Sequence, residues 1–148
     1  MKTVIIGAVA GGATAAARLR RLDENAQIIM LERGGYVSFA NCGLPYYIGG
    51  VVTKKEQLLL QTPESFYKRY RVDVRIHSEA TSIDRKAKKI IIQDHMSGRI
   101  YEESYDKLII SPGAEPKMRF SGAERIFSLR DMNDTFDIKA FIDTKKPK

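Results

Sequence analysis

The side chain best suited to chemistry in this chain is the thiol of Cys42, the single cysteine among 148 residues. Asn41 precedes it and Gly43-Leu44-Pro45 follows, which predicts a helix capped by Asn41 with proline in its first turn. At such a position, free N–H groups and the helix dipole favour thiolate over thiol. Because a thiolate attacks disulfide sulfurs and reduces oxidants, we predict that Cys42 is a redox nucleophile.

The alternative interpretation is that Cys42 is a small, inert, packed side chain, since free cysteine is among the most buried residue types. One cysteine excludes an internal disulfide framework and fits a reducing compartment, so a cytoplasmic protein is expected. No apolar run is long enough to cross a bilayer, and glycines interrupt the apolar stretch after Lys2. Neither a membrane span nor a signal peptide is therefore expected.

A glycine-rich segment near the N-terminus predicts a nucleotide site. Residues 7–12 (GAVAGG) fit the pattern G-x-G-x-x-G, with Val9 at the second glycine. Gly7 permits a tight turn, Gly12 permits close packing of helix on sheet, and the helix N-terminus faces a pyrophosphate. Glu32 lies 20 residues after Gly12, where an acid binds ribose hydroxyls. The residues alone predict an adenine dinucleotide and leave FAD and NAD equally open.

A polar stripe on the first helix is a candidate for a second ligand. Thr14, Arg18 and Arg21 recur at spacings that place them on one helix face. The two arginines could bind phosphates of a thiol-bearing ligand, and the alternative is a solvated helix face. The net charge of +7 also favours anionic partners. Basic residues form no block interleaved with aromatics, so no nucleic-acid partner is expected, and we expect no metal site.

The elements that would position these residues follow from the hydrophobic pattern. Buried parallel strands are expected at residues 2–6, 26–31, 72–76 and 107–110. Helices are expected at residues 11–22, 63–70 and 131–142, the last capped by Asp131 or Asn133. Short segments at 81–83, 89–93 and 99–103 predict an antiparallel β-meander. We therefore expect an α/β, doubly wound half-domain with strand order 72–76, 26–32, 2–6 and 106–111, and the meander packed over one side.

Three segments resemble the FAD-dependent pyridine nucleotide-disulfide oxidoreductases, in the single-cysteine branch that contains coenzyme A disulfide reductases. They are residues 4–12 (VIIGAVAGG), 38–50 (SFANCGLPYYIGG) and 105–114 (YDKLIISPGA). The segment around Cys42 is the most specific of the three, and a valine at the second glycine position is shared by that branch. The resemblance spans essentially the whole chain and implies a Rossmann-like FAD-binding half-domain.

The resemblance also implies the cofactors and the site. It implies FAD beside Cys42, reduction by NAD(P)H, and a mixed disulfide between Cys42 and coenzyme A. The residues expected to bind FAD are Gly7, Val9, Ala10, Gly12, Glu32, Arg33, Ala80, Ser111, Gly113 and Arg130. The residues expected to bind coenzyme A are Thr14, Arg18, Arg21, Ser38 and Asn41.

Several alternatives remain open at this point. Peroxidases and water-forming oxidases of this branch carry a histidine where this chain has Ala10, which disfavours an NADH oxidase. Reductases of coenzyme A persulfide or polysulfide share the Cys42 pattern, and the preference for NADH or NADPH is open. An alternative of another class is a non-catalytic nucleotide-binding module with a structural Cys42.

Relatives in the resembled family are longer than this chain. The resemblance therefore implies that residues 1–144 are the N-terminal part of an FAD-binding domain and that 145–148 begin a linker to an NAD(P)H domain. The part alone is expected not to complete turnover, and the longer enzyme is expected to be a homodimer.

Overall fold

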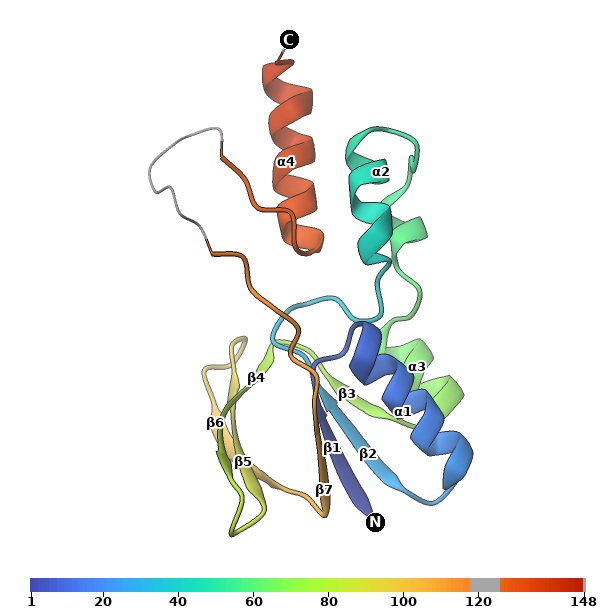
Figure 1. The fold of residues 1–148 in the computed structure, drawn as a ribbon, viewed down its shortest axis with the longest axis vertical. Helices are drawn as coiled ribbons and strands as arrows, with labels where there is room; N and C mark the ends of the chain where they lie inside the picture. The colour runs from blue at the N-terminus through green and yellow to red at the C-terminus, as the bar shows by residue number, and fades with distance from the viewer. Residues whose placement is uncertain (118–125, 148) are drawn as a thin grey trace. The chain divides into compact units, whose positions relative to one another are not determined.

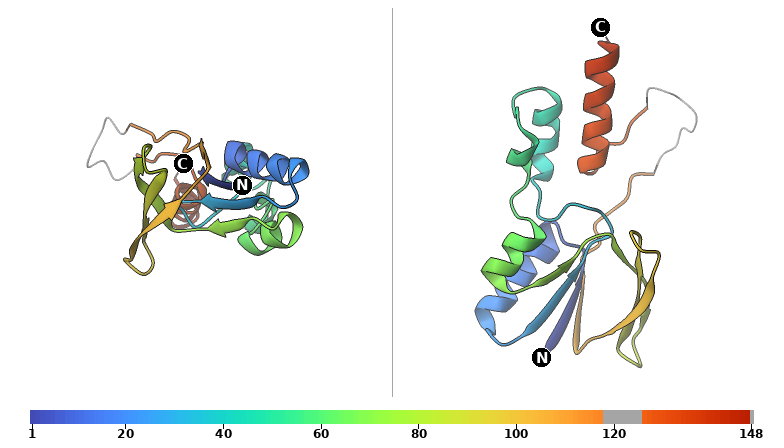
Figure 2. Two further views of the ribbon diagram at one scale, coloured as in Figure 1. Left: turned by 90° about the horizontal axis from the view of Figure 1, so that it is seen from below. Right: turned by 180° about the vertical axis from the view of Figure 1, so that it is seen from behind.

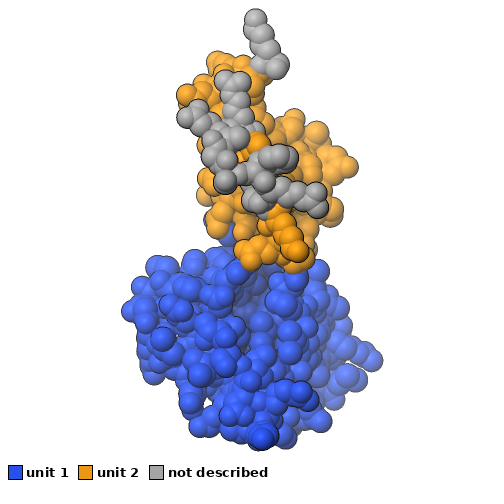
Figure 3. Space-filling model, turned by 60° about the vertical axis from the view of Figure 1, so that its left-hand side comes forward, with its two compact units in different colours: residues 1–39, 61–113 blue, residues 40–60, 114–148 orange. Residues whose placement is uncertain are grey.

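The computed structural model describes residues 1–117 and 126–147. The chain forms two compact units, residues 1–39 with 61–113 and residues 40–60 with 114–148 (Figure 3). The first unit contains both sheets and the second contains the segment around Cys42. Each unit is thus built from two separate stretches of sequence.

A four-stranded parallel sheet forms the centre of the first unit. Its strands are β1 (Lys2–Ile6), β2 (Gln27–Leu31), β3 (Asp73–Arg75) and β7 (Lys107–Ile110). They lie in the order β3-β2-β1-β7, so the predicted order is confirmed (Figure 1). In the register, Val4 of the central strand pairs with Ile29 on one side and with Leu108 on the other.

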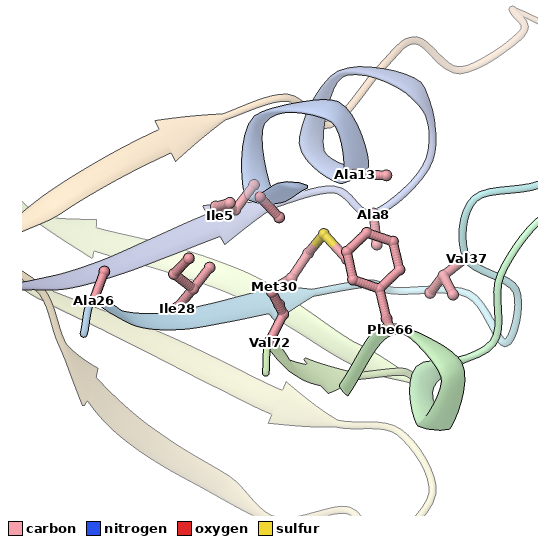
Figure 4. Packing of buried hydrophobic residues seen from close by; sticks show 10 residues of the cluster. Ile5, Ala8, Ala13, Ala26, Ile28, Met30, Val37, Phe66 and Val72 are labelled. Carbon is pink, nitrogen blue, oxygen red and sulfur yellow. The ribbon is translucent and has the colours of Figure 1, made fainter. Parts of the chain in front are cut away.

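Two helices, α1 (Ala10–Leu22) and α3 (Pro63–Tyr70), cover one face of this sheet. Figure 2 shows both on that side, and Figure 4 shows the core between them, where Ile5 and Met30 pack near Phe66. Ala16 of α1 is fully buried against this core. Leu22, the last residue of α1, is 66% exposed and does not join this core.

The predicted β-meander covers the other face. Its strands, β4 (Ser78–Asp84), β5 (Lys89–Asp94) and β6 (Ile100–Ser104), pair in antiparallel order β4-β5-β6. Ile90 and Ile92 point from β5 onto Val4, Ile29 and Leu31 of the parallel sheet, which forms a second apolar core. The predicted packing of the meander over one side is therefore confirmed.

The second unit consists of short helices and one long helix. Its elements are the 3-10 helices at Asn41–Gly43 and Lys55–Leu58, α2 (Leu44–Ile48) and α4 (Met132–Lys145). Helices α2 and α4 contact each other through the rings of Tyr47 and Phe136, whose centroids are 6.2 Å apart. Asp131 caps α4 by accepting hydrogen bonds from the N–H groups of Asn133 and Asp134, so the cap is Asp131 and not Asn133.

Arg20 joins the ends of α1 and α3. Its guanidinium donates to the carbonyl oxygens of Tyr70 (2.7 Å) and Arg71 (3.0 Å) at the end of α3. It also donates to the carbonyl oxygens of Asp23 (3.1 Å) and Glu24 (2.6 Å), which follow α1. Carbonyls at helix C-termini lack partners within the helix, so one side chain satisfies two helix ends.

A partly buried carboxylate ties the meander to the parallel sheet. Glu103 of β6 accepts hydrogen bonds from the Lys2 ammonium of β1 and from Arg75 of β3, the latter at 2.7 Å. The side chain of Glu103 is only 14% exposed. Burial by itself raises the pKa of Glu103, but the hydrogen bonds and charges of Lys2 and Arg75 outweigh burial and hold it below its ordinary value.

Glu103→Gln is expected to lower the free energy of unfolding at pH 7 by about 1 to 2 kcal/mol. A depressed folded pKa stabilises the protein above the unfolded value of 4.5, and this contribution is lost as the pH falls through the folded value. The difference in free energy of unfolding between wild type and variant should therefore be largest at pH 7 and shrink below pH 4.5. Urea unfolding at several pH values measures it.

Glu102→Gln is the matched control for this prediction. Glu102 pairs with Lys89 at 2.7 Å, but both side chains are about half exposed, so its loss should have little effect. Equal effects of the two substitutions at pH 7 would show that the network of Glu103 with Lys2 and Arg75 does not stabilise the contact between the sheets.

Candidate functional site

The loop between β1 and α1 is held by close contacts between backbones. Gly7 has φ +94°, and a Cβ there would lie 2.0 Å from the carbonyl oxygen of Ser111. A Cβ on Gly12 would lie 1.7 Å from the carbonyl oxygen of Gly7. The conformational roles predicted for Gly7 and Gly12 are therefore confirmed, because no side chain fits at either position.

The start of α1 presents free backbone donors. The helix begins at Ala10 with Val9 as its N-cap residue, and no side chain caps it. Within this fully described helix, the first turn carries no acidic residue. The N–H groups and the positive end of the dipole are therefore available to an anion, as a dinucleotide-binding turn requires.

Glu32 follows β2 and holds the glycine-rich loop directly. One carboxylate oxygen accepts from the backbone N–H of Ala8 at 3.0 Å, and the other accepts from Gly34 at 2.9 Å. A carboxylate offers about four acceptor positions, so two remain for ribose hydroxyls. The spacing between Gly12 and Glu32 did not predict these two backbone contacts, which depend on how the loop turns after β2.

Other residues predicted to bind the nucleotide lie at the same edge of the sheet. The backbone N–H of Ser111, just after β7, donates to Ile6 at 2.8 Å, and the hydroxyl of Ser111 faces Gly11. Gly113 follows with φ +75°. Ser38 has φ +46° and donates from its N–H to the carbonyl of Ala8 at 2.9 Å. The carboxyl ends of β1 and β7 and the segment after β2 therefore converge on one loop.

The remaining predicted residues of the first unit lie farther along its elements. Arg33 follows Glu32, and its side chain is 59% exposed. Ala80 lies in β4 at a register shift between Ala80 and Ser82. Thr14, Arg18 and Arg21 are all exposed on α1, so the polar stripe does face solvent.

Cys42 lies in the second unit, and its side chain is exposed. The interpretation of Cys42 as a packed core residue is therefore wrong. The predicted cap is also wrong, because Asn41 lies inside the 3-10 helix and makes no side-chain capping bond. Pro45 does stand in the first turn of α2, as predicted. Asn41 does not cap α2 because a 3-10 turn leads into that helix, whereas a capping residue has an extended backbone.

Leu58, a buried leucine, packs against the turn that carries Cys42. Leu58 accepts a backbone hydrogen bond from Ala40 at 2.8 Å, and its side chain is 1% exposed. A Cβ on Gly43 would lie 2.8 Å from this side chain, so glycine lets Leu58 pack closely beneath the turn. The exposed thiol of Cys42 thus lies on a turn that is held in place by its contacts with Leu58.

Arg130 also belongs to the second unit. Its guanidinium donates to the carbonyl of Ala114 at 2.7 Å, and its backbone N–H donates to Asp134 at 2.7 Å. The structure therefore brings Gly7, Glu32, Ser38 and Ser111 together in one unit. It places Asn41, Cys42 and Arg130 in the other.

A second cluster of titratable groups was not predicted. His77, Glu79 and His95 lie beside the loop after β2, and Nε2 of His95 is hydrogen-bonded to a carboxylate oxygen of Glu79 at 2.8 Å. His77 and His95 become neighbours because Ser78 pairs with Asp94 in the β4–β5 register. Among residues 1–117 and 126–147, no group of three or more potential ligands could hold a metal ion. Nor is any helix in these ranges long and apolar enough to span a bilayer.

The sequence and the fold of this chain are similar to those of known proteins. Residues 1–146 match the pyridine nucleotide-disulphide oxidoreductase family. The chain is 40% identical to coenzyme A disulfide reductase of Staphylococcus epidermidis over 145 residues, which cover 98% of this chain and 33% of that protein. The chain thus spans about a third of the length of the curated relatives it matches.

Two solved structures are similar over nearly the whole chain. Reduced Bacillus anthracis CoADR-RHD has a TM-score of 0.95 and 52% identity, covering 99% of this chain and 27% of that one. A NAD-dependent persulfide reductase from A. fulgidus has a TM-score of 0.89 and 35% identity, covering 97% of this chain and 28% of that one.

Proposed function

The chain belongs to the pyridine nucleotide-disulphide oxidoreductase family, and from this premise we propose that it is the FAD-binding and cysteine-bearing part of an NAD(P)H-dependent coenzyme A disulfide reductase. The observation that carries the proposal is the exposed Cys42 on a supported turn, in a chain 40% identical to a reductase of that name. The proposal takes residues 1–144 as the N-terminal part of the FAD-binding domain and 145–148 as the start of a linker. It takes the longer enzyme as a cytoplasmic homodimer.

The glycine-rich loop fits the adenosine diphosphate part of FAD. The cradle formed by Gly7 and Gly12 leaves no room for side chains, and the first turn of α1 offers unpaired donors to a pyrophosphate. Glu32 retains acceptor positions for a ribose. When bound, FAD accepts a hydride from NAD(P)H and supplies two electrons for disulfide reduction. The other residues proposed to contact it are Val9, Ala10, Arg33, Ala80, Ser111, Gly113 and Arg130.

Cys42 is the proposed nucleophile. Its thiolate attacks one sulfur of coenzyme A disulfide, the S–S bond breaks, and one coenzyme A leaves as a thiolate. The product is a mixed disulfide between Cys42 and the second coenzyme A. Two electrons and one proton then release that coenzyme A as a thiol and restore the Cys42 thiolate.

Intact mass of the 148-residue chain tests this step directly. Incubated with coenzyme A disulfide and no reductant, the chain should gain one coenzyme A, and peptide mapping should place it on Cys42. Dithiothreitol should remove it. A folded chain that binds FAD but gains no coenzyme A would contradict the substrate while leaving the cofactor site intact.

We further propose that Thr14, Arg18, Arg21, Ser38 and Asn41 bind coenzyme A. Arg18→Ala with Arg21→Ala is expected to slow formation of the Cys42 adduct about tenfold, because two guanidinium groups that bind phosphates are lost. The measurement is the rate of adduct formation by intact mass at low salt, where exposed charges are least screened.

The matched control is Arg85→Ala with Lys86→Ala. Both residues are exposed in the turn between β4 and β5, and the change in net charge is the same. The control should slow adduct formation less than twofold. Equal slowing by the two double variants would mean that net charge causes the effect. The stripe on α1 would then be an ordinary solvated helix face and not a binding site.

A coenzyme A persulfide or polysulfide reductase is the second candidate. It is favoured by the 35% identity to the persulfide reductase from A. fulgidus. The two candidates differ in the product, because reduction of coenzyme A persulfide releases sulfide whereas reduction of coenzyme A disulfide releases only thiol. The ratio of turnover with the two substrates in the longer enzyme decides between them.

A further inference from the structure

Cys42 and Tyr46 lie on the same exposed face of one short helical run in the second unit. The 3-10 helix at Asn41–Gly43 continues into α2, and the backbone at the junction is right-handed helical. Residues three and four positions apart share one face of such a run, so Pro45 and Tyr46 lie beside Cys42. Both neighbours are exposed, and the large side chain of Tyr46 is 58% exposed.

The opposite face of this run fixes its orientation within the second unit. Leu44 is buried, and the ring of Tyr47 packs edge-on against α4, which lies beside α2 (Figure 1). At the end of α2, the N–H groups of Val51 and Val52 both donate to the carbonyl of Tyr46, at 2.9 and 3.1 Å. These contacts hold the backbone of Tyr46 so that its side chain leaves the run on the solvent side, next to the thiol.

Coenzyme A bonded to Cys42 begins at this face. The arm next to its sulfur alternates pairs of methylene groups with amides and ends at a dimethyl-substituted carbon. A tyrosine ring offers a large apolar surface to such groups and loses little conformational entropy on binding, because it has only two χ angles. A helical run rises about 1.5 to 2 Å per residue, so Tyr46 lies about 6 to 8 Å from Cys42 along the axis. The arm of the adduct therefore starts within reach of the ring.

We propose that Tyr46 is a binding residue for the uncharged arm of coenzyme A, and that it selects coenzyme A disulfide over small disulfides at Cys42. This inference rests on the proposed function. The arginines of α1 are proposed to bind the phosphates, whereas Tyr46 acts on the part of the substrate that carries no charge. No bond forms or breaks at Tyr46: the exchange at the Cys42 sulfur is unchanged, and the ring increases the fraction of time that the disulfide spends beside the thiolate.

Adduct formation with three disulfides tests the proposal on the 148-residue chain. Coenzyme A disulfide carries the arm and the nucleotide, pantethine carries the arm alone, and hydroxyethyl disulfide carries neither. Tyr46→Ala should raise the half-saturating concentration of the first two about fivefold, because the arm loses its packing on the ring. The limiting rate with each, and the rate with hydroxyethyl disulfide, should equal those of the wild type. Intact mass as a function of time measures all of these rates.

Two further variants serve as controls. Tyr46→Phe should behave as the wild type toward every disulfide, because it keeps the ring that packs on the arm. Tyr67→Ala removes a tyrosine of similar exposure, since Tyr67 lies on α3 and is 63% exposed. Tyr67→Ala should change none of the rates, because Tyr67 lies in the other compact unit and is not a neighbour of Cys42 in the helical run.

The outcomes separate this inference from the proposed function. Equal slowing of Tyr46→Ala with all three disulfides would show that Tyr46 acts on the turn or the thiol, and slowing with coenzyme A disulfide alone would place it on the nucleotide. Either result would overturn the inference, as would wild-type rates in Tyr46→Ala or a Tyr46→Phe variant that is equally impaired. A wild-type chain that reacts with hydroxyethyl disulfide but not with coenzyme A disulfide would instead contradict the proposed function.

Discussion

Replacing Gly12 by alanine is expected to abolish FAD binding and to lower the free energy of unfolding by about 3 kcal/mol. The added Cβ would lie 1.7 Å from the carbonyl oxygen of Gly7 and 2.8 Å from its carbonyl carbon. Backbone atoms cannot rotate away as a side chain can, so α1 must move off the loop. Urea unfolding and quenching of flavin fluorescence measure the two effects.

Two other glycines give graded controls. A Cβ on Gly11 would lie 2.3 Å from the hydroxyl of Ser111, and a hydroxyl can rotate away. Gly11→Ala should therefore lower the free energy of unfolding less than Gly12→Ala does. Adding Ser111→Ala should remove the clash and restore stability. Gly49 has ordinary helical φ and meets only Pro45 at 3.4 Å, so Gly49→Ala should be neutral or slightly stabilising. Similar losses in Gly12→Ala and Gly49→Ala would refute the close-approach argument.

Replacing Cys42 by serine is expected to abolish capture of coenzyme A and to slow disulfide reduction by the longer enzyme on the order of 1,000-fold or more. A hydroxyl cannot form the mixed disulfide, and the chain has no other cysteine to replace it. FAD affinity should be unchanged, since Gly7, Gly12 and Glu32 lie in the other compact unit. Intact mass, NAD(P)H oxidation and flavin fluorescence measure these three properties.

Cys42 must also react with coenzyme A disulfide faster than an arbitrary exposed thiol does. Cys42→Ser combined with Ser82→Cys provides this comparison, because Ser82 is exposed on β4 of the first unit. The thiol at position 82 should react with coenzyme A disulfide at least about tenfold more slowly. Equal rates would mean that the turn carrying Cys42 contributes nothing to its reactivity.

Most of the fold could be predicted from the sequence, because each element has a strong local pattern. The β-branched run at Lys2–Ile6 and the proline-started helix at Pro63–Tyr70 have the predicted bounds. The sheet order was also correct, since βαβ units leave few ways to order parallel strands. Helix α4 runs three residues beyond its predicted end at Ile142, where no glycine or proline stops it before Pro147.

The parts that could not be predicted depend on contacts between distant residues or on turn geometry. The 3-10 turn at Asn41 has the same local signals as a capped α-helix, so the wrong cap was predicted. The meeting of Glu79 with His95 depends on the pairing of β4 with β5, whose register shifts at Ala80. The contacts of Glu32 with Ala8 and Gly34 depend on a loop path that residue types do not specify.

The position of β1 has a consequence for how the protein is made. Of the strands in this sheet, β1 comes first along the chain, yet it is an interior strand, and Thr3 must pair with Lys107, 104 residues later. Until β7 is synthesised, the nascent chain keeps one edge of an apolar strand unpaired, and aggregation competes with folding throughout that interval. The exposed edge of β1 should therefore be protected only when translation has passed β7.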